Sequence, residues 1–132
     1  MKISIFGISH ATINIIESIE NFSDEIEIFD LNNNFDFKNE ISDKKNIKIN
    51  IDQNLINDPK NIIENSDYVF LASNSDILNS FFYHKFIGNF DKNKIQMIIL
   101  NKDLYEMYKS KNYSVINLFD SSKNEIVTTI RS

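Results

Sequence analysis

Five residues at the first bend of the chain have the types and spacing of a phosphate-binding turn: Gly7, Ser9, His10, Ala11 and Thr12. Gly7 follows an apolar run and permits a tight turn, and the first N–H groups of a helix beyond it can bind an anion. Ser9 and Thr12 stand where dinucleotide-binding turns usually have their second and third glycines, and His10 can donate a hydrogen bond to a phosphate. An ordinary strand-to-helix turn with an exposed His10 explains the same residues equally well.

A carboxylate ends the second apolar run, about twenty residues after the turn, as expected for a ribose-binding acid. This residue is Asp30, and Leu31 follows it. A carboxylate here can accept hydrogen bonds from both ribose hydroxyls, which favours NAD over NADP, and no arginine or lysine follows directly to bind a 2′-phosphate. The alternative is that Asp30 only begins a turn before three asparagines, but the spacing favours the ribose contact.

Further polar residues follow the third and fourth predicted strands. Asp52 comes directly after the third strand and is expected on the adenine side of a bound nucleotide, although an ordinary loop carboxylate is as compatible. Ala72, Ser73 and Asn74 lie at the carboxyl end of the fourth strand, beside the crevice where ligands bind in open parallel sheets. Ser73 and Asn74 can also cap the next helix, and the two roles are compatible.

These residues need a frame of alternating strands and helices to bring them together. The predicted strands cover residues 2–8, 25–30, 47–51, 68–72, 95–100 and 114–119. The first predicted helix covers residues 11–22, and a short one falls within 31–42. A third is expected to begin with Asp58 as its N-cap and Pro59 at its first helical position. The fourth follows residues 73–75 and is expected to turn its apolar side chains inward, namely Ile77, Leu78, Phe81, Phe82 and Phe86. A fifth begins at Asn101 or Asp103, and a short terminal one is opened by Ser122 with Glu125.

This order predicts a single α/β domain over residues 1–132 with a Rossmann-like, doubly wound parallel sheet of six strands. The third strand alternates isoleucines with Lys48 and Asn50, so one of its faces is polar, as expected at a sheet edge. An edge position for the third strand fits the strand order 3-2-1-4-5-6.

Composition narrows the function classes. A net charge of −5 makes free nucleic acid a poor partner. The chain has no cysteine, so thiol catalysis and thiolate metal sites are excluded. No segment reaches the length of a membrane span and no signal peptide precedes the first strand, so we expect a cytoplasmic protein without direct membrane insertion. His10 and His84 are the only histidines and have no zinc-ligand spacing, and no catalytic motif is present, so we expect no enzymatic activity.

Taken together, the segments resemble the N-terminal nucleotide-binding domain of Trk-type potassium-uptake regulators, the RCK or KTN family. Gly7-x-Ser9-His10-x-Thr12 stands in place of the family's G-x-G-R-x-G, and Asp52 falls in its G-D-A-T segment. Residues 66–79 look like its A-D-x-V-I-x-x-T-x-D-D-x-x-N. In that stretch Ser73 falls on the threonine, Asp76 on the second acid and Asn79 on the asparagine. The chain departs from the family at His10, and at Leu100 and Asn101, where the family has phosphate-facing arginines.

The resemblance implies a regulatory domain that binds NAD(H) or an adenine nucleotide and forms a homodimer. It further implies that the domain controls potassium transport through a membrane transporter or channel, at whose inner face it could sit. Two other classes stay open on the sequence. One is a fragment of an NAD-dependent oxidoreductase. The other is a Rossmann-like interaction module in which the nucleotide site is vestigial.

Overall fold

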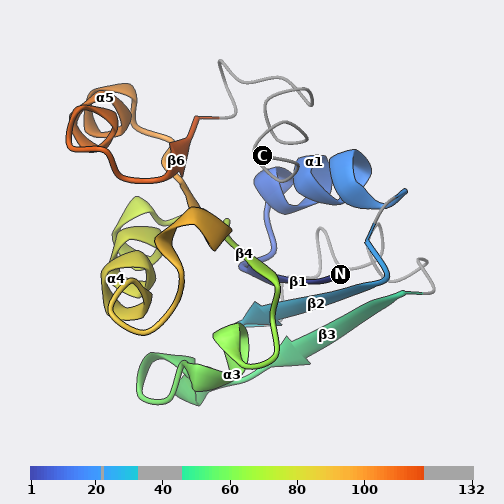
Figure 1. The fold of residues 1–132 in the computed structure, drawn as a ribbon. Helices are drawn as coiled ribbons and strands as arrows, with labels where there is room; N and C mark the ends of the chain where they lie inside the picture. Colours follow the sequence, from blue (N-terminus) through green and yellow to red (C-terminus); the bar gives the residue numbers. More distant parts are fainter. Residues whose placement is uncertain (22, 33–45, 118–132) are drawn as a thin grey trace.

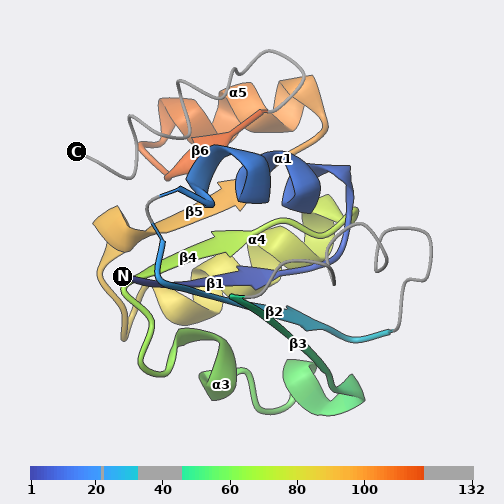
Figure 2. The ribbon, with the colours of Figure 1, turned by 90° about the vertical axis from the view of Figure 1, so that its right-hand side faces the viewer.

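The computed structural model describes residues 1–21, 23–32 and 46–117 and confirms the predicted fold class. Six parallel strands form one sheet in the order β3-β2-β1-β4-β5-β6 (Figures 1 and 2). The strands are β1 Lys2–Phe6, β2 Glu25–Asp30, β3 Ile47–Ile51, β4 Tyr68–Leu71, β5 Ile95–Ile98 and β6 Val115–Ile116. The sheet order reverses between β1 and β4, so the carboxyl ends of these two strands are the switch point at which open parallel sheets bind ligands.

Helices connect the strands on both faces of the sheet. The helical segments are α1 His10–Ile19, the 3-10 turn η1 Gln53–Ile56, α3 Lys60–Ile63, α4 Asp76–Phe86, the 3-10 turn η2 Lys92–Lys94 and α5 Lys102–Ser110. α1 covers one face, and α3 and α4 cover the other (Figure 1). The predicted short helix within 31–42 and the predicted terminal helix from Ser122 fall on residues outside the described ranges.

Alternate residues of each inner strand point to opposite faces, and both faces are apolar over most of their area. On the side of α1, Ile3 and Ile5 pack with Ile26 and Ile28. On the side of α4, Phe6 belongs to a second apolar core, which packs against this helix. β4 is buried at every position, as its continuous apolar run predicts. The sheet is therefore a rigid support for the loops at its carboxyl edge.

The prediction for the face of α4 was partly wrong. Ile77 and Phe81, which were expected to face inward, are 82% and 41% exposed. Phe82 and Phe86 are buried as expected, and Tyr83 is buried between them. The physical reason is the buried side-chain amide of Asn79, one turn before Tyr83. Its hydrogen bonds, described in the next subsection, fix the rotation of α4 about its axis.

Several element ends also differ from the predictions. β1, β4 and β5 end two, one and two residues earlier than predicted, because the chain turns into the loops at the carboxyl edge. Pro59, and not Asp58, is the N-cap of α3, since the turn that ends η1 continues as far as Asp58, whose N–H donates to the carbonyl of Asn54. α3 is only four residues long, because the backbone becomes extended at Glu64 and has a positive φ at Asn65. Of the two predicted starts of α5, Asn101 and Asp103, the structure has Asn101 as the N-cap.

Candidate functional site

The first turn requires glycine at position 7. Gly7 has a φ of +98°, and its N–H donates to the carbonyl of Phe29 at 2.7 Å. A Cβ atom here would lie 2.4 Å from Cα of Ser73, in the loop that follows β4. The turn after β1 and the loop after β4 therefore approach each other more closely than any side chain permits.

The side chains of Ser9 and Thr12 are buried and hold this turn together. The hydroxyl of Ser9 donates to the carbonyl of Ala72 at 2.6 Å. The hydroxyl of Thr12 donates to the carbonyl of Gly7 at 2.6 Å and accepts from the N–H of Ser9 at 3.1 Å. The residues at the second and third glycine positions thus tie the turn to the end of β4, with their side chains directed into the protein.

The start of α1 completes the turn. His10 is the first residue of α1 and is exposed, whereas Ala11 is buried. The first N–H groups of any helix lack partners within the helix, so this end carries a partial positive charge. The exposed imidazole therefore stands beside the positive end of α1, as the sequence predicted.

Asp30 faces this turn from the end of β2. One carboxylate oxygen accepts from the N–H of Ile8 at 2.9 Å and the other accepts from the N–H of Leu31 at 2.7 Å. Burial raises the pKa of Asp30, and hydrogen bonds from the backbone of Leu31, Ile8 and Asn32 only partly offset this rise. A carboxylate oxygen can accept more than one hydrogen bond, so Asp30 keeps acceptor capacity for ribose hydroxyls. Leu31 is half-buried beside it.

The loop after β4 is fixed by the fully buried amide of Asn79. Its oxygen accepts from the N–H and the hydroxyl of Ser73, at 3.0 and 2.7 Å. Its NH2 group donates to the carbonyls of Ser73 and Ile98, at 3.0 and 2.8 Å. Asn79 therefore uses all its hydrogen-bonding groups within the protein and sets the rotation of α4. Asn74, on the same loop, is exposed.

Asp76 joins this loop to the next one along the sheet. Its two carboxylate oxygens accept from the N–H groups of Leu100 and Asn101, at 2.7 and 3.0 Å. The sequence resemblance pointed to Asp76 as an acid of the pattern, without a role. In the structure it fixes the loop after β5 relative to α4.

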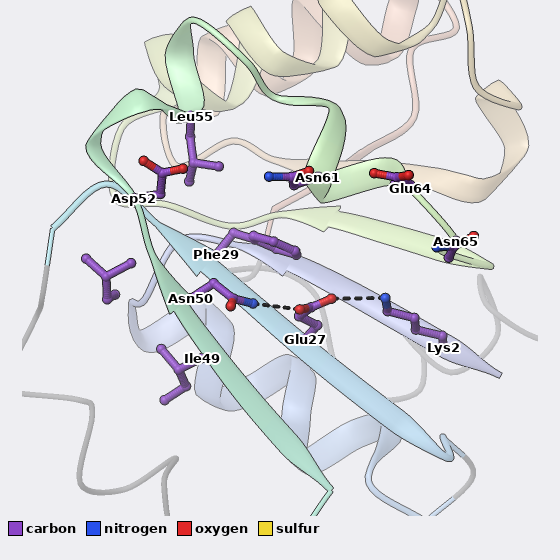
Figure 3. A pocket seen from close by; sticks show the side chains of 11 residues that line it. Lys2, Glu27, Phe29, Ile49, Asn50, Asp52, Leu55, Asn61, Glu64 and Asn65 are labelled. Atoms are coloured by element: carbon purple, nitrogen blue, oxygen red, sulfur yellow. Dashed lines mark hydrogen bonds and ion pairs between the residues drawn. The ribbon is translucent and has the colours of Figure 1, made fainter.

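The structure places most of the predicted residues at the carboxyl edge of the sheet, but it turns the side chain of Asp52 away from them. The N–H of Asp52 donates to the carbonyl of Asp30 at 2.9 Å, which joins the two loops through the backbone. Its carboxylate caps η1, accepting from the N–H of Asn54 at 2.8 Å, and lines a groove on the face of the sheet that carries α3 (Figure 3).

This groove was not predicted. It has a volume of about 550 Å³ and crosses the first three strands beneath α3. Its lining residues come from β1, β2, β3, η1 and α3 with the loops that flank them: Lys2, Glu27, Phe29, Ile49, Asn50, Ile51, Asp52, Leu55, Asn61, Glu64 and Asn65. A charged residue inside the apolar run of β2, in phase with the polar residues of β3, was the sequence signal that could have revealed it.

Glu27 is the centre of the groove floor. Lys2 forms an ion pair with one of its oxygens at 2.9 Å, and Asn50 donates to the other at 2.6 Å (Figure 3). The ammonium group of Lys48 lies 3.8 Å from the same oxygen as Asn50. Burial opposes ionisation, but the hydrogen bonds from Lys2 and Asn50 and the charges of Lys2 and Lys48 outweigh it, so the pKa of Glu27 is lowered.

Within the described residues, no group of three or more histidine, aspartate or glutamate side chains is placed to hold a metal ion. No helix in the same part of the chain has the length and apolar character needed to cross a membrane. Compared with known proteins, the chain matches no protein-family model, and no curated protein matches its sequence.

Proposed function

We propose that the chain is a regulatory, non-catalytic domain that binds NAD(H) or an adenine nucleotide at the crevice beside the first turn. The observation that carries the proposal is the position of Asp30. Its carboxylate ends β2, faces the turn at Gly7, and is held by backbone N–H groups rather than by a cation. Such a carboxylate can accept hydrogen bonds from the two hydroxyls of an adenosine ribose.

The phosphates would lie at the start of α1. The helix end favours an anion there, and His10 is exposed on its first residue. The loop that contains Asn74 would border the crevice from the side of β4. Because the Ser9 and Thr12 side chains are directed into the protein, they do not fill the space outside the turn.

The partner of this domain is proposed from the resemblance to Trk-type regulators. In that view the domain forms a homodimer in the cytoplasm and passes its ligand state to a membrane potassium transporter or channel. Nucleotide binding is the first link in this chain of events. It is also the link that can be measured on the isolated domain.

The test is a thermal-shift titration with NAD, NADH, ATP, ADP and AMP. A ligand that binds only the folded state stabilises it by roughly 2.7 kcal/mol at 100 times its dissociation constant. We expect one of these nucleotides to raise the melting temperature by several degrees. The increase should be lost in Asp30→Ala and kept in Glu106→Ala, which removes an exposed carboxylate from α5. A shift that survives in Asp30→Ala would refute the site as described.

One observation favours a second function, that of an interaction module with a vestigial nucleotide site. Two N–H groups of the turn, those of Ile8 and Ser9, are already bonded to the side chains of Asp30 and Thr12. If they stay bonded, they cannot donate to a pyrophosphate. This function predicts no thermal shift with any of the five nucleotides at millimolar concentration, together with self-association that light scattering would detect.

A further inference from the structure

The groove beneath α3 is separate from the proposed nucleotide crevice, and it exists because the sheet is incompletely covered. α3 has only four residues, so among the described residues part of the face of β2 and β3 is left open. Figure 3 shows the floor of the groove, where Lys2, Glu27 and Asn50 cross three neighbouring strands in one line. The resulting hollow of about 550 Å³ is large enough for a small organic molecule.

The floor is not what packing alone would select. The inner strands of a parallel sheet are normally apolar on both faces. Glu27 is nonetheless only 9% exposed, and a buried ion pair is often no more stable than apolar residues of similar size. Lys2 and Asn50 hold one oxygen of Glu27 each, so the floor is both polar and rigid. Ligand sites place a few polar groups at fixed positions in a hollow that also has apolar walls, and this floor supplies such groups next to Phe29 and Leu55.

The wall above the floor carries free acceptors. Asp52, Asn61 and Glu64 lie in a row along the groove in Figure 3, with the two carboxylates at the ends. One oxygen of Asp52 caps η1, and in the described part of the chain its other oxygen and the carboxylate of Glu64 have no hydrogen-bond or ion-pair partner. Lys2 and Lys48 together carry one positive charge more than Glu27 offsets, and the two carboxylates of Asp52 and Glu64 outweigh that excess, so the net charge around the groove is negative.

We propose that this groove binds a linear aliphatic diammonium ion, the chemical class of the α,ω-diamines and polyamines. One ammonium group would pair with Asp52 and the other with Glu64, while the amide oxygen of Asn61 accepts a hydrogen bond between them. The methylene chain would lie along the apolar side chains of Phe29 and Leu55, which also line the groove. The separation of the two carboxylates along the row selects for a ligand with charges at both ends over a single small cation.

This proposal goes beyond the proposed function and is independent of it. The crevice uses the carboxyl edge of the sheet and the side of α1, whereas the groove uses the face that carries α3. The nucleotide-induced thermal shift should therefore be the same in variants of the groove wall as in the original chain. Failure of either proposal leaves the other standing.

The test is isothermal titration calorimetry with 1,4-diaminobutane and spermidine at low ionic strength, on the original chain and two matched double variants. Asp52→Asn with Glu64→Gln removes both charges of the wall, and asparagine keeps the cap on η1. Asp91→Asn with Glu106→Gln removes the same charge elsewhere, from the cap of η2 and from exposed α5. We expect the wall variant to bind about 25-fold more weakly and the control to change by less than about twofold.

A site-specific readout accompanies the titration. In 15N–1H correlation spectra, the side-chain NH2 signals of Asn61 and Asn50 should shift on addition of 1,4-diaminobutane. Butylamine, which has one ammonium group, should bind more weakly than the diamine. The proposal is overturned if neither 1,4-diaminobutane nor spermidine produces heat or spectral shifts at millimolar concentration. It is also overturned if the control variant loses as much affinity as the wall variant, or if butylamine binds as tightly as 1,4-diaminobutane.

Discussion

Two carboxylates of one strand, β2, have opposite environments. Glu27 lies in the middle of the strand and is paired with side chains, chiefly Lys2 and Asn50, so its pKa is lowered although burial opposes this. Asp30 lies at the end of the strand, where burial raises its pKa and only backbone N–H groups oppose the rise. An acid neutralised by cations is part of the fixed structure, whereas an acid held by neutral donors keeps its charge available to a ligand.

The same contrast separates the two regions around these acids. In the turn, the polar side chains of Ser9 and Thr12 are bonded to backbone groups of the turn and of β4, so they serve the shape of the crevice. In the groove, the floor is bonded internally, whereas Asp52 and Glu64 of the wall have acceptor oxygens without a partner among the residues that the structure describes. At the turn, ligand binding is therefore expected to use backbone groups and Asp30. In the groove, it is expected to use the side chains of the wall.

The largest effect on stability is expected at Gly7, where the turn leaves no space for a side chain. Gly7→Ala should lower the free energy of unfolding by at least about 3 kcal/mol, because it combines a positive φ with a close approach to backbone atoms. The new Cβ would lie 2.4 Å from Cα of Ser73 and 2.5 Å from its nitrogen. Urea denaturation followed by circular dichroism measures the loss.

Gly88→Ala is the matched control, since no atom lies within 4 Å of a Cβ at position 88. We expect it to change stability by less than about 1 kcal/mol. If Gly7→Ala were as stable as Gly88→Ala, the close packing of the turn against the loop after β4 would be wrong. The turn would then lie farther from the loop after β4, and its contrast with the open groove would disappear.

A smaller effect is expected at the groove floor. Glu27→Gln should lower the free energy of unfolding by about 2 kcal/mol at pH 7, because it removes the charge that Lys2 and Lys48 stabilise. Since the folded pKa of Glu27 is lowered, this contribution is complete above the ordinary glutamate value, near pH ~4.3, and is lost as the pH falls through the folded pKa.

Urea titrations of the original chain and Glu27→Gln between pH 7 and pH 3 measure this difference. Glu106→Gln, on the exposed side of α5, is the control and should stay within about 0.5 kcal/mol of the original chain. A Glu27→Gln protein as stable as the control at pH 7 would mean that the ion pairs of the floor contribute nothing. Glu27 would then resemble Asp30, and the comparison of the two acids would fail.

The fold could be predicted from the sequence because each strand and most helices have their own local pattern. Apolar runs bounded by polar turns identify the strands, and the polar face of β3 identifies the edge of the sheet. The face of α4 could not be predicted from apolar spacing, because the buried polar residue Asn79 decides its rotation. Ile77 therefore faces outward despite its apolar side chain.

The candidate site was predictable in part. Gly7 and Asp30 could be placed because turn geometry and strand ends follow from local sequence. The inward direction of the Ser9 side chain could not, since its hydroxyl donates to the carbonyl of Ala72, which follows β4 and is distant in the chain. The groove was missed because its floor is formed between strands: Glu27 pairs in register with Lys48, and this register is a property of the assembled sheet.

The smallest predicted effect is at Asp30, and its sign is opposite to that at Glu27. Because burial raises the folded pKa of Asp30, its charge lowers stability above that pKa. As the pH falls toward the ordinary aspartate value, near ~3.9, the folded protein takes up this proton before the unfolded chain does. Relative to Asp30→Asn, the original chain should therefore gain up to about 1 kcal/mol of stability on acidification, whereas relative to Glu27→Gln it should lose stability. Urea titrations of the three proteins over the same pH range measure both differences. If the two differences change in the same direction with pH, the two acids of β2 do not have the opposed environments from which separate roles are inferred.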